Sequence, residues 1–225
     1  MNTYYWVGRT AMMSLAHAVW RPTILGKGNV PATGGVLLAS NHLSFIDSFA
    51  IPVAAPRKVS FLAKNEYFTG TGIRGRLIRG FMEAGDAIPV DRDSSRGASD
   101  SLDLALQVLR DGKAFGIYPE GTRSRDGRLY RGRTGVAFLS LTADVPVVPV
   151  GLIGTDKVQP VGERGLKLAD VTIAFGTPIL PSTYAGLPAG RARRQLTDDV
   201  MDSIAALTGQ ERAPGYNERG ATEEP

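Results

Sequence analysis

Short apolar runs alternate with helix-forming segments along most of the chain, and this alternation limits the possible folds more than any other feature. Six runs are apolar almost throughout, as strands buried on both faces are. Strands separated by helices are typical of an α/β sheet covered on both faces. The sequence therefore predicts a single mixed, mostly parallel sheet flanked by helices. The predicted strands are 36–39, 59–63, 87–90, 114–118, 145–151 and 171–175, and the predicted helices are 47–54, 75–82, 98–110, 134–142 and 191–207.

The first predicted strand is followed by a histidine and an aspartate at a spacing that no helix face would produce. His42 and Asp47 are five residues apart, whereas neighbours on one helix face are three or four apart. The two side chains are therefore expected to meet across a turn. Ser44, three residues before Asp47, resembles the start of a capping box, which predicts that a helix begins here.

A histidine in such a turn, with a carboxylate at one ring nitrogen, has the arrangement of a general base. The carboxylate of Asp47 would fix the tautomer of His42 and leave the second ring nitrogen free to take a proton. A structural role is the alternative, since both residue types favour turns and a helix cap requires no chemistry. The short motif alone does not decide between the two.

Three further clusters follow later strands, where the functional groups of α/β sheets gather. Arg92 comes just after the strand that ends at Val90, and a guanidinium there can bind a phosphate through two hydrogen bonds. The segment 118–124 ends the next strand and combines a carboxylate, a glycine and a second arginine in one turn. The run 145–150 contains two prolines, which predict an edge strand or a bulge because proline cannot donate to a central ladder.

The composition excludes several kinds of catalytic and metal site but does not identify a substrate. The 225 residues, of which 43% are hydrophobic, suffice for one packed core, so a single α/β domain over residues 25–208 is expected. The absence of cysteine excludes disulfides, thiolate metal sites and a cysteine nucleophile, and two histidines are too few for a His-rich metal site. The net charge of +4 favours anionic partners such as phosphorylated metabolites, anionic lipid or nucleic acid.

Residues 1–24 are predicted to form an amphipathic interfacial helix. Arg9, His17 and Arg21 interrupt its apolar residues, so no run is long enough to span a bilayer. A helix with aromatic ends and basic residues can lie in the headgroup region, which predicts a membrane-docking element. Packing of this helix on its own domain is one alternative, and a signal peptide is another. The polar tail 209–225 is predicted to be disordered.

Taken in order, these motifs resemble those of the glycerolipid acyltransferase family, specifically the bacterial 1-acylglycerol-3-phosphate acyltransferases. The first and third blocks are specific, whereas the second and fourth are loose. Tyr118 stands where the family usually has phenylalanine before Pro-Glu-Gly, a change expected to be harmless, and Pro89 stands where members often have an apolar residue. The four blocks are Asn41–Asp47, Gly85–Arg92, Tyr118–Ser124 and Val145–Val150, within a resemblance that covers about residues 25–180.

The resemblance implies the transfer of an acyl chain from acyl-CoA or acyl carrier protein to the free hydroxyl of 1-acylglycerol-3-phosphate, giving phosphatidic acid. It implies His42 as the general base and Asp47 as its orienting partner. Without a Gly-x-Ser-x-Gly motif or a cysteine, direct transfer without an acyl-enzyme is the economical mechanism. No metal or cofactor is expected, and the implied location is the cytoplasmic face of the membrane. The residues implied to bind the acceptor phosphate or shape its pocket are Lys64, Arg92, Glu120, Gly121 and Arg123.

Other functions remain open from the sequence alone. Glycerol-3-phosphate or another lysolipid is an alternative acceptor, and a thioester or phosphoester hydrolase is able to use the same dyad. The segment Gly70–Gly75 matches G-x-G-x-x-G, but six residues separate it from the preceding strand, which argues against a dinucleotide site. A noncatalytic anion-binding module is a further alternative. Nucleic-acid binding is not expected, because the basic residues are not interleaved with aromatic ones.

Overall fold

A computed structural model gives the fold, which is built around one seven-stranded sheet with the strand order β1-β7-β6-β2-β5-β3-β4. Neighbouring strands pair in parallel, except that β6 and β7 are antiparallel. The predicted mixed, mostly parallel sheet is therefore confirmed. The residues described are Val7, Thr10, Ser14, 20–72, 75–76, 79–80, 87–90, 97–160, 163 and 165–218. The strands are β1 (Thr23–Leu25), β2 (Val36–Ser40), β3 (Val59–Lys64), β4 (Ile88–Val90), β5 (Ala114–Ile117), β6 (Val147–Ile153) and β7 (Thr172–Phe175).

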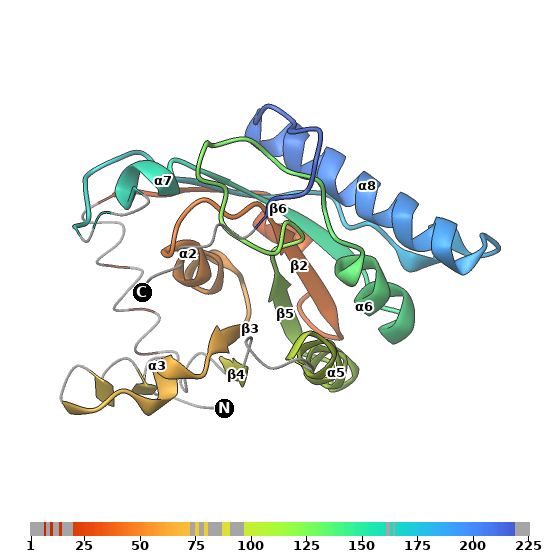
Figure 1. The fold of residues 1–225 in the computed structure, drawn as a ribbon, viewed down its shortest axis with the longest axis horizontal. Coiled ribbons are helices and arrows are strands. Elements are labelled where there is room, and N and C mark those ends of the chain that lie inside the picture. The colour runs from red at the N-terminus through yellow and green to blue at the C-terminus, as the bar shows by residue number, and fades with distance from the viewer. Residues whose placement is uncertain are drawn as a thin grey trace.

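Helices cover both faces of this sheet, as Figure 1 shows. The helices are α2 (Asp47–Ala54), α3 (Glu66–Thr69), α5 (Gly97–Arg110), α6 (Gly135–Ala143), α7 (Thr155–Val158) and α8 (Ala189–Thr208), with two 3₁₀ turns, η1 (Lys27–Asn29) and η2 (Pro181–Tyr184). Side chains of α5, α6 and α8 form one apolar core with the sheet, and those of α2 belong to a second core. In β2, Leu37 faces the first core and Leu38 the second, as the alternation of strand side chains requires. The strand that precedes the dyad is thus fixed from both sides.

Two features of the sheet differ from the sequence prediction. Strand β1 was not predicted, because its three residues are too few to produce a clear apolar pattern. Strand β6 lies inside the sheet between β7 and β2, so the edge alternative for the proline run is wrong. The ladder with β7 is interrupted beside Pro149: Phe175 pairs with Val150, and the next bridge joins Val147 to Ile179. Pro149 O still accepts from Gly176 N at 2.8 Å on that side, so the missing N–H of Pro149 leaves a bulge rather than a free edge.

Residues 209–218 belong to the tail that was predicted to be disordered, and the structure places them against the loop 119–133. Leu129 N donates to Glu211 O at 2.8 Å, and Ala213 N donates to Leu129 O at 2.9 Å. Ala213 is buried, with 6% of its surface exposed. Because the segment is mostly polar, its sequence did not predict that Ala213 would be buried or that its backbone would pair with Leu129. Residues 219–225 lie outside the described part of the chain.

Other predictions fall on segments that the structure describes only in part. Most of the N-terminal helix (1–24) and of the predicted helix 75–82 lies outside the described residues. Among the helices that are described, none is long and apolar enough to cross a membrane.

Candidate active site

The structure brings His42 and Asp47 together at the carboxyl end of the central strand β2. His42 lies in the turn after β2, and Asp47 is the first residue of α2. The distance between His42 Nδ1 and Asp47 Oδ2 is 2.9 Å. The carboxylate is fully buried, whereas 16% of the histidine side chain is exposed. This edge of the sheet is where α/β folds place their functional groups.

The backbone of the turn fixes the Asp47 carboxylate. Oδ2 also accepts hydrogen bonds from Leu43 N at 2.7 Å and Ser44 N at 2.8 Å. An acceptor held in this way favours the tautomer in which His42 Nδ1 carries the proton and Nε2 has a free lone pair. The predicted capping box is only half formed, because the Ser44 hydroxyl donates to Gln159 O at 2.9 Å and not to the helix.

Tyr118 packs face to face against the histidine ring. The ring centroids of His42 and Tyr118 are 3.8 Å apart, and the planes are inclined by 10°. The Tyr118 hydroxyl lies 3.1 Å from Ser48 Oγ in α2, and the Phe61 ring of β3 packs behind it at 5.7 Å. Gly116 makes room for Phe61, since a Cβ at that position would lie 2.0 Å from the ring. The imidazole therefore has a well-defined wall on one side.

Glu120 is a buried carboxyl group that binds the backbone of two loops. Its Oε1 accepts from His42 N at 3.3 Å, and its Oε2 accepts from Tyr130 N at 2.9 Å. Burial raises the pKa of Glu120 to about 7, against the opposing effect of these two hydrogen bonds. In this position the side chain links the dyad turn to the loop 119–133, which follows β5.

The loop 119–133 is fastened beside the dyad. Ser124 N donates to His42 O at 2.8 Å, and Arg133 N donates to Pro119 O at 2.8 Å. Gly121 has a φ of +82°, and a Cβ there would lie 3.1 Å from Arg133 Nε, so the turn requires glycine. These contacts place Arg123, between Gly121 and Ser124, close to the histidine turn.

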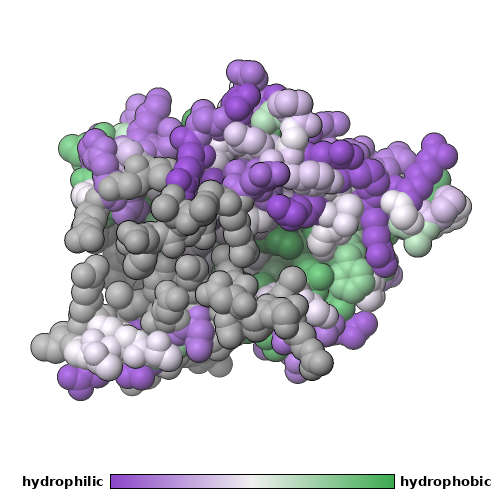
Figure 2. Space-filling view, in the orientation of Figure 1, coloured by the Kyte–Doolittle hydropathy of each residue, from purple (hydrophilic) through white to green (hydrophobic). Residues whose placement is uncertain are grey.

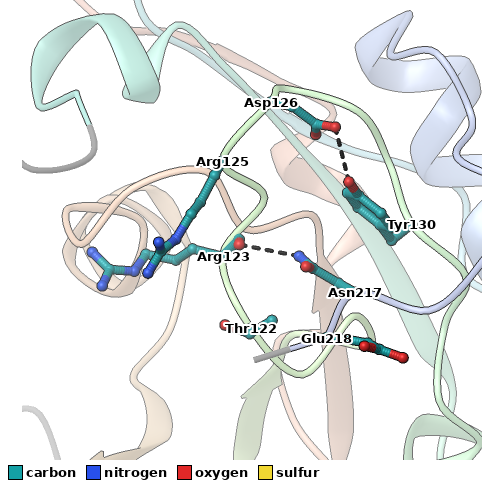
Figure 3. A pocket seen from close by; sticks show the side chains of 7 residues that line it. All are labelled: Thr122, Arg123, Arg125, Asp126, Tyr130, Asn217 and Glu218. Atoms are coloured by element: carbon teal, nitrogen blue, oxygen red, sulfur yellow. Dashed lines mark hydrogen bonds between the residues drawn. The ribbon is translucent and has the colours of Figure 1, made fainter. Parts of the chain in front are cut away.

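A cavity of about 220 Å³ opens on this loop. In Figure 3 the side chains of Arg123 and Arg125 extend to the same side of the loop, away from Asn217. No hydrogen bond or ion pair of the Arg123 guanidinium is found among the described residues. Guanidinium groups bind anions well, so the exposed side of this loop that carries Arg123 is suited to an anion. The residues that line the cavity are Thr122, Arg123, Arg125, Asp126, Tyr130, Asn217 and Glu218.

Asp126, one of the two acidic residues at the same cavity, is paired with its neighbours. Asp126 Oδ2 accepts from Tyr130 Oη at 2.8 Å and from Arg128 Nε at 2.8 Å. Desolvation alone would raise the pKa of Asp126, but the hydrogen bonds from Tyr130, Arg128 and Ser124 outweigh it and hold the pKa well below its usual range. Asp126 is therefore ionised and paired with Arg128.

The remaining predicted site residues are only partly described. Lys64 ends β3, where its backbone pairs in register with Val90 of β4. This places the Lys64 Cα at the same edge of the sheet as the dyad, but the Lys64 side chain is not among the described parts of the structure. Arg92 also lies outside the described residues. Within the described part of the chain there is no group of three or more His, Asp or Glu residues arranged to hold a metal ion.

Three residues of the site were given no role from the sequence. Asn41 Oδ1 accepts from Leu152 N at 2.8 Å, and its Nδ2 donates to Leu152 O at 2.9 Å, which fixes the end of β2 to β6. Tyr118 was taken as a harmless replacement, although it stacks on His42. Asn217 lies in the segment predicted to be disordered. For these three residues, the only signal in the sequence was an asparagine directly before the histidine.

Comparison with known proteins assigns the fold and the site to a family. The Acyltransferase family model matches residues 21–153, which is more than half of the chain and includes the dyad and the loop after β5. The chain belongs to the acyltransferase family. The resemblance noted in the sequence is thereby confirmed.

Individual relatives of this acyltransferase-family chain carry related names. A 1-acyl-sn-glycerol-3-phosphate acyltransferase of Bacillus subtilis is 28% identical over 186 residues, covering 82% of this chain and 86% of that protein. A chloroplastic enzyme of the same name from Brassica napus is 30% identical over 184 residues, covering 80% of this chain and 51% of its own length. The chain thus spans about half the length of the plant relatives it matches.

A solved structure supports the fold of this acyltransferase-family chain. The 1-acyl-sn-glycerophosphate (LPA) acyltransferase of Thermotoga maritima superposes with a TM-score of 0.67 at 20% sequence identity. The match covers 92% of this chain and 83% of that one. The two proteins therefore share their overall architecture.

Proposed function

We propose that the protein transfers a fatty acyl chain from acyl-CoA or acyl carrier protein to the free hydroxyl of 1-acylglycerol-3-phosphate, giving phosphatidic acid. The observation that carries this proposal is the 2.9 Å contact between His42 Nδ1 and Asp47 Oδ2, in a turn to which the Arg123-containing loop is bonded through Ser124 N and His42 O. The names of the bacterial and plant relatives support the choice of acceptor.

His42 acts as the general base in this proposal. Its Nε2 takes the hydroxyl proton as the acceptor oxygen attacks the thioester carbonyl, and the proton then goes to the departing thiolate. The new ester C–O bond forms while the C–S bond breaks, so no acyl-enzyme is needed. General base catalysis of this kind contributes a factor of about 10² to 10⁴ in rate.

Arg123 and Arg125 are proposed to bind the acceptor phosphate, with Lys64 and Arg92 assisting from the β3–β4 edge. Fixing the phosphate would hold the acceptor hydroxyl near the thioester carbonyl in the orientation needed for attack. The reaction would then not depend on a chance encounter of the two groups. Glu120 and Gly121 shape the loop that carries Arg123. The Glu120 carboxylate binds the loop backbone at Tyr130 N, and Gly121 allows the turn that needs a positive φ. The chemistry requires no metal or cofactor.

The protein is proposed to work at the cytoplasmic face of the membrane, as a peripheral or monotopic protein. Both the acceptor and the product of the proposed reaction are amphiphiles that reside in a lipid surface. The net charge of +4 supports association with anionic lipid.

The test is thioester consumption with a long-chain acyl-CoA, with and without 1-acylglycerol-3-phosphate. The native chain should form phosphatidic acid only with the acceptor, and His42→Ala and Asp47→Asn should lower kcat by about 10² to 10⁴. Asp111→Asn is the matched control, since Asp111 is exposed at the amino end of β5, away from the dyad. Free fatty acid without acceptor would assign a hydrolase instead, and normal transfer by folded His42→Ala would refute the proposed base.

A further inference from the structure

We infer that residues 209–218, the C-terminal strap, position the loop that carries Arg123 for binding of the acceptor phosphate, with Asn217 as the positioning residue. This inference rests on the proposed function, because it takes Arg123 as a ligand of the acceptor phosphate. Figure 3 shows Asn217 and Glu218 on the opposite side of the loop from the two arginine side chains. No structural role for these residues was predicted from the sequence.

The strap begins with a contact to the dyad turn. Gln210 Oε1 accepts from Asn41 Nδ2 at 2.8 Å, and Gln210 Nε2 donates to Gly127 O at 2.7 Å. Asn41 precedes His42 directly and is completely buried. One glutamine side chain therefore joins the end of β2 to the loop 119–133.

The middle of the strap runs beside this loop as a short parallel ladder. The isolated bridge pairs Leu129 with Arg212, and Arg131 N donates to Gly215 O at 2.9 Å. Tyr216 then lies against two guanidinium groups, those of Arg131 at 5.3 Å and Arg133 at 5.5 Å from the ring centroid. Cation–π contacts of this kind stabilise a pair by about 0.5–1 kcal/mol at exposed sites.

These contacts divide the arginines of the loop into two groups. Arg131 and Arg133 pack on Tyr216, and Arg128 pairs with Asp126, so these three hold the loop together. Arg123 makes no such contact among the described residues, and its side chain extends to the other side of the loop in Figure 3. The side of the molecule over this loop and α8 is covered mainly by hydrophilic residues in Figure 2. The strap thus binds Arg131 and Arg133 and leaves the Arg123 side chain uncovered.

The end of the strap acts directly on the backbone of Arg123. Asn217 Nδ2 donates to Arg123 O at 3.1 Å, while Arg133 Nη2 donates to Asn217 O at 3.4 Å. Arg123 is bracketed by Gly121, which has a positive φ, and by Ser124, whose N–H is bonded to His42 O. The Asn217 amide adds a third restraint, at the peptide whose direction sets where the Arg123 guanidinium points.

The test compares Asn217→Ala with the native full-length chain. We expect the KM for 1-acylglycerol-3-phosphate to rise about fivefold to tenfold, as for one lost hydrogen bond, with the KM for acyl-CoA unchanged and kcat within about twofold. Amide hydrogen exchange at Ser124 and Arg133 should be faster in the variant, because the loop loses a restraint.

Asn29→Ala is the matched control. Asn29 Nδ2 also donates to a distant backbone carbonyl, Phe175 O at 2.9 Å, at the opposite edge of the sheet. An equal rise in the KM for 1-acylglycerol-3-phosphate in the two variants would overturn the inference, because it would show a general effect on stability. Unchanged acceptor KM and unchanged exchange in Asn217→Ala would overturn it as well. If the native chain transfers no acyl group to the acceptor, the proposed function fails, and the exchange data alone then decide whether the strap holds the loop.

Discussion

At the scale of single residues, the dyad depends on partners that hold each of its side chains. One oxygen of Asp47 accepts from His42 Nδ1 and from two backbone amides, so the carboxylate cannot rotate without losing all three hydrogen bonds. The imidazole is held by Asp47 at one nitrogen and by the Tyr118 ring at one face. Both restraints act on the direction in which Nε2 points.

Tyr118 is expected to act through its ring more than through its hydroxyl. Tyr118→Phe keeps the 3.8 Å stack on His42 and removes the hydroxyl that contacts Ser48, so kcat should stay within about threefold of the native value. Tyr118→Ala removes the wall and should lower kcat at least about tenfold, with a smaller effect on either KM. Steady-state kinetics on chains of matched thermal stability decide between the two.

Ser48→Ala serves as the control for this prediction, because it deletes the same hydrogen bond from the α2 side. It should behave as Tyr118→Phe does. A large loss of kcat in both of these variants would show that the hydroxyl contact, and not ring stacking, positions the histidine.

The sequence was sufficient to predict the dyad but not its supports. His42 and Asp47 are close in the chain, so a turn and a helix start bring them together whatever the rest of the molecule does. The stack of His42 on Tyr118 requires β2 and β5 to be neighbours in register, which Leu37 and Phe115 show in the structure. Pairing between distant strands cannot be read from local patterns.

At the scale of elements, the loop 119–133 is the part that joins base and pocket, and Glu120 is its buried anchor. Burial raises the pKa of Glu120 from 4.5 to about 7. The folded state therefore binds the proton more tightly than the unfolded state does. The stability that this proton contributes is fully present below about pH 4.5, decreases as the pH rises, and is lost above about pH 7.

Glu120→Gln should remove this pH dependence. Relative to the variant, the native chain is expected to lose about 2 kcal/mol of unfolding free energy between about pH 5 and about pH 7.5. Urea unfolding at the two pH values measures the difference, and Asp111→Asn, at an exposed site, controls for the general effect of losing a carboxylate. If the difference in unfolding free energy between the native chain and Glu120→Gln is the same at both pH values, the pKa of Glu120 is not raised.

Elements with a strong local signal were predicted, and those that depend on distant partners were not. The core strands are apolar throughout, and α8 repeats buried residues at Leu196, Val200 and Ile204. Strand β1 and the strap have only short or polar sequences, and each becomes ordered because it pairs with a segment more than 80 residues away, as the bonds from Thr23 to Val171 and from Leu129 to Glu211 show. Residue composition cannot report such pairing.

At the scale of the whole molecule, the proposed function requires the α/β domain to reach an acceptor that resides in a lipid surface. The net charge of +4 provides a long-range attraction to anionic lipid, on which the proposed docking by residues 1–24 would build. Such attraction is screened by salt, since the Debye length falls from about 8 Å at 0.15 M to about 3 Å at 1 M. Membrane association should therefore be sensitive to both lipid charge and ionic strength.

The full chain is expected to sediment with vesicles that contain phosphatidylglycerol and to bind neutral phosphatidylcholine vesicles less well. Raising the salt from about 0.15 M to about 1 M should weaken binding to the anionic vesicles about tenfold, because several basic residues each contribute about 1 kcal/mol near the surface at low screening. His42→Ala should bind as the native chain does, since docking precedes chemistry. Equal binding to both vesicle types, unaffected by salt, would mean that apolar insertion and not charge brings the dyad to its acceptor.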